Sequence, residues 1–309
     1  MKSLLVTFSW FLAVVSSYGQ CNLALSSVLT NAGCYGASSG AIDLTVTGGT
    51  QPLTFLWNNG AVTEDLNNLQ AGSYSVVVLD ASACTESDVF TISQPSPPLT
   101  ITSQPLPQTD CYGNQVEFST VITGSTGTVT YQWQKKPPGG NFSNISGATS
   151  SLLTIDNIGM YSQNTNGTEY RVTISDDCGS LISDPALLGV NSITAINPVA
   201  VNSTICGGEG KWYEVSALGN VIPGGYLWSF NSGSGWTPLS DGTNYSGTNT
   251  ARLTITNATI AQSGSYHVTV TFLTLNQPSG VTTCVETSWS RERNLTVNPK
   301  PVTSVIYHP

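Results

Sequence analysis

Short alternating runs of apolar and polar residues recur along the chain after its first twenty positions. Apolar or β-branched side chains take every second position, or follow one another, over four to seven residues, and clusters of Gly, Asn and Ser separate the runs. This pattern predicts β-strands, for example at residues 41–46, 74–78, 170–174 and 266–270. No 3.6-residue apolar period lasts three turns beyond the N-terminal segment, so we expect an all-β fold with almost no helix.

The N-terminal segment has a different pattern. A lysine precedes a mainly apolar run at residues 4–15, and small or polar residues follow. This order is typical of a secretory signal peptide, and the run is too short for a membrane span, which needs about 20 residues. We therefore predict a signal peptide at residues 1–19, cleavage after it, and a secreted or extracellular chain without a membrane span. Lipidation at Cys21 is the alternative, but the residues before it do not fit a lipobox.

Composition narrows the classes of function. Only 9% of the 309 residues are charged, and the net charge is −9, whereas an ordinary soluble domain has roughly 25% charged residues. Such a chain lacks a surface rich in lysine and arginine, which nucleic acid phosphates and anionic lipids would bind. We therefore expect no nucleic acid partner and no binding to anionic membranes. The length corresponds to two or three domains at about 100–150 residues each.

Seven cysteines provide the next constraint. They include no C-x-x-C pair, and the chain has only two histidines, which excludes zinc fingers and ribbons. An exported chain is expected to form disulfides. Pairing of sequence neighbours leaves Cys21 as a free thiol or as a link to another chain. The predicted bridges are Cys34–Cys84, Cys111–Cys178 and Cys206–Cys284.

Three closed loops with proline-rich joints between them predict three modules. The predicted segments are the signal peptide at 1–19, a first module at 20–96, a second at 97–193, a third at 194–298, and the start of a further module or a linker at 299–309.

The second and third modules share one spacing. Trp133 follows Cys111 by 22 residues, and Trp228 follows Cys206 by 22 residues. A tyrosine then follows each tryptophan after 37 or 38 residues. Two copies of one fold explain this repetition.

A cysteine, a tryptophan about 22 residues later and a late Gly-x-x-Tyr or Gly-x-Tyr strand resemble bacterial immunoglobulin-like domains. The resemblance implies a tandem of β-sandwiches in which each tryptophan fills the space between two sheets. It also implies that Tyr170 and Tyr266 are tyrosine-corner residues. Two positions later, where antibody domains have a cysteine, the chain has Val172 and Val268, so no disulfide across the centre of the sandwich is implied.

The first module carries a different set of ordered motifs, with a departure at residues 81–83. The motifs are Cys34-Tyr35-Gly36 and residues 48–57, 63–66, 69–74 and 78–80. They resemble the SprB repeat of cell-surface adhesins from gliding bacteria that export proteins by type IX secretion. The departure is the absence of the Asn-Gly turn usual in that family. The resemblance implies an exported, extended array for adhesion or spacing and no known ligand.

Candidate catalytic chemistry is sparse. A G-x-S-x-G at residues 36–40 has the form of a hydrolase nucleophile turn, but no helical pattern follows it. His267 is predicted to point outward into solvent from its strand. We interpret the acidic pairs at 64–65 and 176–177 as turn formers. Glycosidase chemistry at these pairs, or calcium at 176–177 or near Asp80, is the alternative. We therefore predict no enzyme and no catalytic, cofactor or metal residues.

Two tryptophans are candidate ligand contacts, because sugars stack on exposed rings. They are Trp212 and Trp236. Trp236 has a counterpart in Phe142 at a similar distance from the core tryptophan, which favours packing in both copies.

Together these patterns predict a secreted or cell-surface adhesion or binding protein of β-sandwich modules. An extracellular polysaccharide or a surface protein is the expected partner. The alternatives are an accessory, carbohydrate-binding region of a larger secreted hydrolase and a pure structural spacer.

Overall fold

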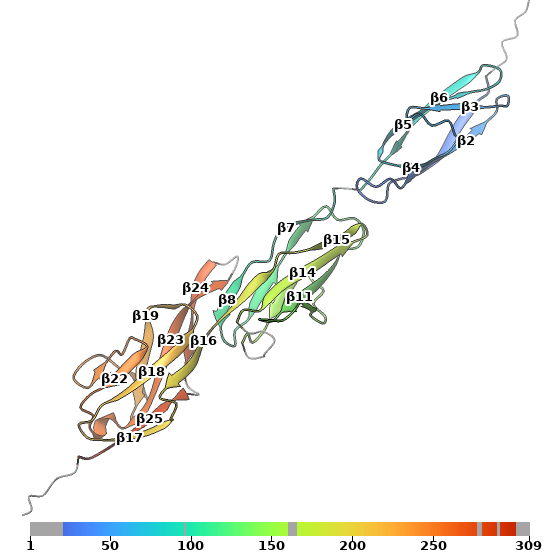
Figure 1. Cartoon of the computed structure of the whole chain (residues 1–309). Coiled ribbons are helices and arrows are strands. Elements are labelled where there is room, and N and C mark those ends of the chain that lie inside the picture. The colour runs from blue at the N-terminus through green and yellow to red at the C-terminus, as the bar shows by residue number, and fades with distance from the viewer. Residues whose placement is uncertain (1–20, 96, 160–165, 277–279, 289–290, 301–309) are drawn as a thin grey trace, which may run out of the picture. The chain divides into compact units, whose positions relative to one another are not determined.

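The computed structural model describes residues 21–95, 97–159, 166–276, 280–288 and 291–300. The predicted signal peptide and residues 301–309 lie outside this part. The chain divides into two compact units, Met1–Pro98 and Leu99–Pro309, and most of their strands are labelled in Figure 1. The prediction of an all-β fold is confirmed, since the described residues form strands and a single 3-10 turn, η1 (Ile260–Gln262).

The first unit is a sandwich of two three-stranded antiparallel sheets, β1-β2-β4 and β3-β5-β6. Its alternating strands point one face inward, and the inward side chains form a core around the fully buried Trp57. The strands are β1 (Ala24–Thr30), β2 (Gly40–Thr47), β3 (Thr54–Trp57), β4 (Leu66–Leu69), β5 (Gly72–Leu79) and β6 (Thr85–Ile92).

The second unit contains two copies of one sandwich, each with its own core. The strands of the first copy are β7 (Thr100–Ser103), β8 (Gln108–Cys111), β9 (Val116–Ser119), β10 (Val121–Thr123), β11 (Thr130–Lys136), β12 (Ser143–Asn144), β13 (Leu152–Ile155), β14 (Glu169–Asp176), β15 (Gly179–Ile182) and the first half of β16 (Ala186–Asn197).

The second copy begins with the other half of β16. Its further strands are β17 (Asn202–Cys206), β18 (Lys211–Leu218), β19 (Val221–Asn231), β20 (Trp236–Pro238), β21 (Tyr245–Ser246), β22 (Arg252–Ile255), β23 (Gly264–Asn276), β24 (Gly280–Thr287) and β25 (Arg293–Asn298).

The copies share their strand pairing. In the first, β8 runs parallel to β16, and β11 pairs with β14. In the second, β17 runs parallel to β25, and β19 pairs with β23. The opposite sheet pairs β9 with β13 in one copy and β18 with β22 in the other. This repetition agrees with the equal spacings in the sequence.

The junction between the two copies is a continuous piece of sheet. Strand β16 pairs with β14 and β8 in the first copy and with β18 in the second (Figure 1). Strand β8 also pairs with β23 through Thr109 and Leu275. One sheet therefore runs through both copies, and no linker separates them.

Each of the three sandwiches contains the same buried tryptophan arrangement. Trp57, Trp133 and Trp228 are at most 2% exposed, and each indole Nε1–H donates to a backbone carbonyl, of Thr63, Ser150 and Thr250 respectively. The predicted role of Trp133 and Trp228 as core residues is thus confirmed. The first unit differs in sequence from the two copies, yet its Trp57 is buried and hydrogen-bonded in the same way.

The predicted tyrosine corner is present in the second copy and also in the first unit. The Tyr266 hydroxyl donates to the carbonyl of Gln262 at 2.8 Å, and the Tyr74 hydroxyl donates to the carbonyl of Gln70 at 3.0 Å. Tyr170 is fully buried in the core of the first copy. These bonds fix the loop before each strand to the strand itself.

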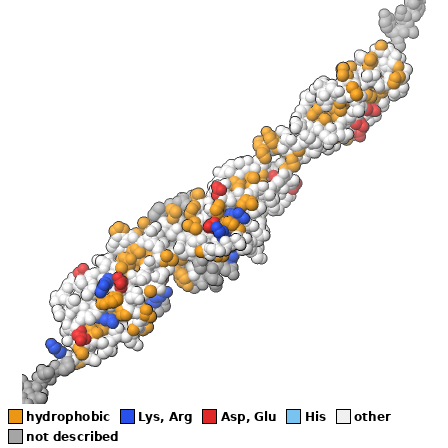
Figure 2. Space-filling view, viewed as in Figure 1, with side chains coloured by type: hydrophobic (Ala, Val, Ile, Leu, Met, Phe, Trp, Pro, Cys, Tyr) orange, Lys and Arg blue, Asp and Glu red, His pale blue; other side chains and the backbone are white. Residues whose placement is uncertain are grey.

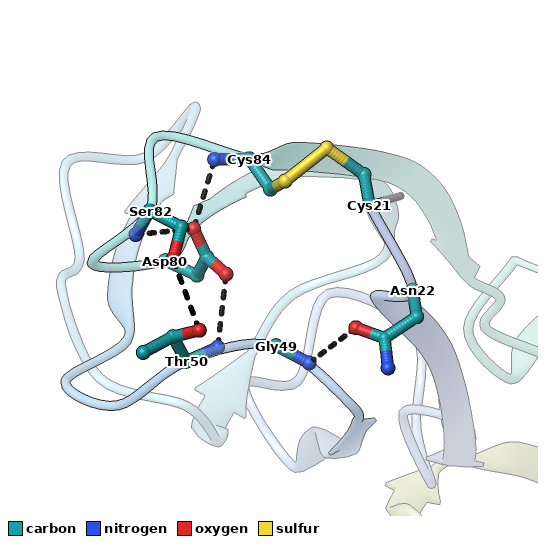
Figure 3. The surroundings of a disulfide bond; sticks show 7 residues. All are labelled: Cys21, Asn22, Gly49, Thr50, Asp80, Ser82 and Cys84. Atoms are coloured by element: carbon teal, nitrogen blue, oxygen red, sulfur yellow. Dashed lines mark hydrogen bonds between the residues drawn. A yellow bond between two sulfur atoms is a disulfide. The ribbon is translucent and has the colours of Figure 1, made fainter. Parts of the chain in front are cut away.

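The predicted disulfide pairing is wrong. Cys84 bonds Cys21, which had been left over (Figure 3), and Cys111 bonds Cys284. Cys206, expected in a bridge, is an exposed free cysteine. Cys34 and Cys178 are disulfide-bonded, but their predicted partners, Cys84 and Cys111, are taken by the bridges above.

Strand register explains two of these errors. Cys206 lies opposite Asn298 at the end of β25, whereas Cys284 lies opposite Phe272, towards the other end of β23. The two cysteines are therefore at opposite ends of the second copy. In the first copy, Cys111 likewise ends β8 at the end remote from the β14–β15 turn that holds Cys178.

Candidate binding surfaces

Trp212 lies on the solvent-facing side of the sheet formed by β16, β18, β22 and β21. Its neighbour Tyr213 points into the core, so strand alternation directs Trp212 outward. The side chain of Trp212 is 38% exposed. The guanidinium of Arg252 lies over the indole, with Cζ 4.4 Å from the ring centroid. Thr254 is the cross-strand neighbour of Trp212. The result is an exposed aromatic ring with cationic and hydroxyl neighbours.

Trp236 has a different environment. It lies on β20 and is half-buried, and its ring stacks on the imidazole of His267 on β23 with the centroids 3.8 Å apart. The prediction that His267 is solvated is wrong, because its side chain is only 4% exposed. Alternation does direct His267 away from the core residue Tyr266, but Trp236 covers it. Burial lowers the pKa of His267, which favours the neutral imidazole.

The predicted correspondence between Trp236 and Phe142 is present in the structure. Arg171 follows Tyr170 as His267 follows Tyr266, and the Arg171 guanidinium lies over the Phe142 ring, with Cζ 3.8 Å from the centroid. Each copy therefore places an aromatic ring over the residue after its buried tyrosine. Trp236 packs within this repeated arrangement. It lies on β20, which pairs with β19, whereas Trp212 lies on β18 in the opposite layer of the sandwich, so the two tryptophans do not form one site.

The acidic turn residues bind backbone amides. The Asp80 carboxylate accepts hydrogen bonds from the amides of Thr50, Ser82 and Cys84 at 2.8–2.9 Å (Figure 3). In the first copy, Asp176 accepts from Thr126, Cys178 and Gly179, each at 2.9 Å. These donors lower the pKa of both carboxyl groups. Asp176 therefore stabilises a turn, as interpreted for the 176–177 pair, and Asp80, named above only as a possible calcium ligand, has the same role in the first unit.

The G-x-S-x-G motif does not lead into a helix. Its last residue, Gly40, begins strand β2, and Ser39 Oγ accepts from the amide of Gly33 at 2.9 Å. The motif is part of a loop that enters a strand, which differs from the strand-to-helix turn of hydrolases. Among the described residues, the cluster of metal-ligand types is Asp110, Cys111 and Cys284, and its two cysteines are joined to each other.

Two further surfaces were not predicted from the sequence. The first is a polar pocket of about 360 Å³ at the junction of the copies, lined by residues that include Tyr112, Glu286 and Arg291. Glu286 accepts from the amide of Ile193 at 2.7 Å, and Arg291 donates to the carbonyl of the same residue. Burial raises the pKa of Glu286. These contacts fix β16 to the second copy.

The second unpredicted surface is an apolar groove of about 460 Å³ at the far end of the second copy, beside Cys206. Its lining comes from the turn after β17, the segment around η1 and the end of β25. The lining residues are Gly207, Gly208, Ala258, Thr259, Ile260, Ala261, Asn298, Pro299 and Lys300.

Charged side chains are sparse on the visible surface. Figure 2 shows few blue or red patches, and uncharged polar groups cover most of the face drawn. No helix among the described residues is long and apolar enough to cross a membrane.

The sheet pairing, core tryptophans and tyrosine corner define a tandem of immunoglobulin-like β-sandwiches. Residues 26–62 match the SprB repeat family, so the chain carries an SprB-repeat module followed by immunoglobulin-like domains. Residues 100–192 match a family described as a domain of unknown function, DUF8696. A comparison with curated proteins finds no match.

Several solved structures are similar over most of the chain. Three N-terminal domains of the Hoc outer capsid protein of bacteriophage RB49 are 18% identical, with 89% of this chain and 100% of that chain covered and a TM-score of 0.47. The I9–I11 tandem of titin is 13% identical, with 89% and 100% covered and a TM-score of 0.34. Domains 3–5 of Drosophila OTK are 11% identical, with 88% and 97% covered and a TM-score of 0.31.

Proposed function

We propose that the chain is a non-catalytic, extracellular adhesion or binding protein that is displayed on a bacterial surface after type IX secretion. The SprB-repeat match supports a surface location. The bridges Cys21–Cys84 and Cys111–Cys284 support an oxidising compartment, because disulfides rarely persist in the cytosol.

The exposed Trp212 is the observation that carries a binding role. Its indole lies on the outer face of a regular sheet, where Thr254 and Arg252 supply hydrogen-bond donors beside the ring. A flat ring next to hydroxyl and guanidinium groups suits a polysaccharide, whose sugar faces stack and whose hydroxyls form hydrogen bonds. The weak charge of the chain favours a neutral glycan over an ionic ligand.

The test is a glycan and matrix-protein array probed with the purified chain, followed by affinity measurement on the best ligand. Trp212→Ala should weaken binding by roughly tenfold or more, which corresponds to about 1.4 kcal/mol. Leu227→Ala is the matched control, since Leu227 is 39% exposed on the other sheet of the same copy. Equal binding by the wild type and Trp212→Ala would contradict this assignment.

A structural spacer is the second candidate, and the continuous strand β16 favours it. A spacer needs fixed geometry between its modules and no ligand. Absence of any binding on the array would support the spacer over the adhesin. A catalytic domain encoded beyond residue 309 would instead support an accessory region of a secreted hydrolase.

A further inference from the structure

Cys111 and Cys206 occupy equivalent positions in the two copies. Cys111 is the last residue of β8 and lies opposite Asn191 on β16 in a parallel pair. Cys206 is the last residue of β17 and lies opposite Asn298 on β25, also in a parallel pair. The equal spacing of 22 residues to the buried tryptophan agrees with this equivalence.

The turns after the two cysteines have the same hydrogen bonds. In the first copy, the amide-to-carbonyl bonds are Tyr112 to Asn191, Gly113 to Ile158, Asn114 to Cys111 and Ile158 to Asn114. In the second copy, the corresponding bonds are Gly207 to Asn298, Gly208 to Ala258, Glu209 to Cys206 and Ala258 to Glu209. All eight distances lie between 2.8 and 3.0 Å. The backbone therefore forms one structure twice, and we call it the terminal pole of each copy.

In the first copy, the next module covers this pole. The β23–β24 hairpin of the second copy contacts it by three routes. Cys111 is bonded to Cys284 on β24, the Asn191 amide Nδ2 donates to the carbonyl of Leu273 on β23 at 2.7 Å, and Thr109 pairs with Leu275. The pole is thus a docking site for a hairpin that carries a cysteine.

In the second copy, the equivalent pole is open among the described residues. Cys206 is free and exposed, and Asn298, the equivalent of Asn191, is exposed as well. The apolar groove described above lies at this pole, and the side chain of Ile260 within it is 61% exposed.

We infer that the Cys206 pole is the docking and disulfide site for the hairpin of a further immunoglobulin-like module that follows Lys300 in the polypeptide. That hairpin corresponds to β23–β24 and carries an unpaired cysteine equivalent to Cys284. The hairpin of a second copy of this chain cannot supply the thiol, because its Cys284 is already disulfide-bonded. Asn298, at the end of β25, corresponds to Asn191. Strand β16 continues beyond Asn191 directly into the next copy, so the chain beyond Asn298 leads to the equivalent place.

The bond forms by oxidation of two thiols. The Cys206 thiol and the hairpin thiol lose two protons and two electrons as their sulfurs join. A disulfide-bearing oxidoreductase in the exporting compartment accepts the electrons, and its disulfide becomes a dithiol. Oxidised glutathione, which becomes two molecules of glutathione, replaces it in vitro.

An extended chain tests the inference. Residues 21–298 are followed directly by a second copy of residues 192–300, so that Asn298 leads into the added module as Asn191 leads into the existing one. The protein is oxidised with a glutathione buffer, digested without reduction and mapped by mass spectrometry. We expect a bond between Cys206 and the added copy of Cys284, with one reactive thiol per molecule, at the added copy of Cys206.

Cys206→Ser in the extended chain is the matched variant. It should raise the count of reactive thiols from one to two, because the added hairpin cysteine then has no partner. Three reactive thiols in the unsubstituted extended chain would overturn the inference, and so would a Cys206–Cys206 dimer.

A second measurement does not depend on folding of the added module. Disulfides are mapped in the complete polypeptide as its native host secretes it. A bond from Cys206 to a hairpin cysteine beyond residue 309 supports the inference. A free Cys206 thiol or a bond from Cys206 to another chain overturns it. Neither result depends on glycan binding by Trp212, so this proposal and the proposed function fail independently.

Discussion

Cys111 and Cys284 are separated by 173 residues in sequence, yet their Cα atoms lie 5.9 Å apart and their sulfurs are bonded. The bond joins the end of β8 in one copy to β24 in the next. It reinforces a junction that already contains the shared strand β16 and the contact between β8 and β23. The two copies therefore behave as one unit because covalent and hydrogen-bonded links act at the same place.

Removal of this bond should destabilise the second unit. For the double variant Cys111→Ala, Cys284→Ala, the chain-entropy treatment of a loop this long gives a loss of at most about 5 kcal/mol. Denaturant unfolding of the double variant and of the wild type, both without reductant so that the other disulfides stay intact, measures the loss. Cys206→Ser is the control and should leave the unfolding midpoint unchanged. An unchanged midpoint in the double variant would show that the bond adds nothing to the sheet contacts.

Acid should weaken the second copy through His267. Burial lowers the pKa of this imidazole below its usual 6.5, so the folded chain resists protonation more than the unfolded chain does. Its contribution to stability is complete above pH 6.5 and declines as the pH falls below that value towards the folded pKa. The melting temperature, measured between pH 7.5 and pH 4.5, should fall less in His267→Phe than in wild type. Parallel curves for the two proteins would contradict the assignment.

The first unit should respond to acid through Asp80. Three backbone amides lower the pKa of its carboxyl group below 3.8, so the stability that it contributes is present above that value and is lost as the pH falls through the folded pKa. Asp80→Asn should reduce the stability of the unit at neutral pH, because a neutral amide is a weaker acceptor, and should flatten the acid limb of the melting curve.

Asp43→Asn is the control for Asp80→Asn, since Asp43 is an exposed residue on β2. Thermal melting of both variants between pH 2.5 and pH 7 provides the comparison. Equal effects of the two substitutions would contradict the role of Asp80 in the turn.

The two tyrosine corners should differ in their contribution to stability. Tyr266→Phe removes a hydrogen bond from a buried hydroxyl to the Gln262 carbonyl, which should cost about 1–2 kcal/mol. Tyr74→Phe removes the corresponding bond at an exposed site, where water replaces the lost donor, and should cost less. Urea unfolding measures both. A larger loss for Tyr74→Phe than for Tyr266→Phe would refute the dependence on burial.

The fold was predictable where the signal is local. Strand alternation placed Tyr170 and Val172 on the same, inward face of their strand. The equal spacing from cysteine to tryptophan identified the repeat that contains Trp133 and Trp228. The bridges were not predictable, because pairing of sequence neighbours assumes that each module closes on itself. Cys111 and Cys206 occupy equivalent positions in the two copies, but this equivalence did not indicate that the partner of Cys111 lies on the next module.

The candidate site shows the same limit. The sequence directs His267 away from the core, but it does not reveal that Trp236, more than thirty residues earlier, folds back over the ring. Trp212 points outward as well, but among the described residues the group over its ring is the Arg252 guanidinium and no aromatic ring covers it. This difference arises from tertiary contacts. The groove at the terminal pole beside Cys206 was missed because its residues come from three segments that are separate in the sequence and form a groove only when these segments meet.

Strand β16 supplies inward side chains to both copies, with Leu188 in one core and Ile193 in the other. Tension applied along the chain therefore passes from the first copy to the second through one extended backbone, with no swivel between them. The adjoining ladders with β8 and β18 are loaded in shear, so that several hydrogen bonds resist together instead of opening one at a time. We therefore expect this joint to extend little under tension.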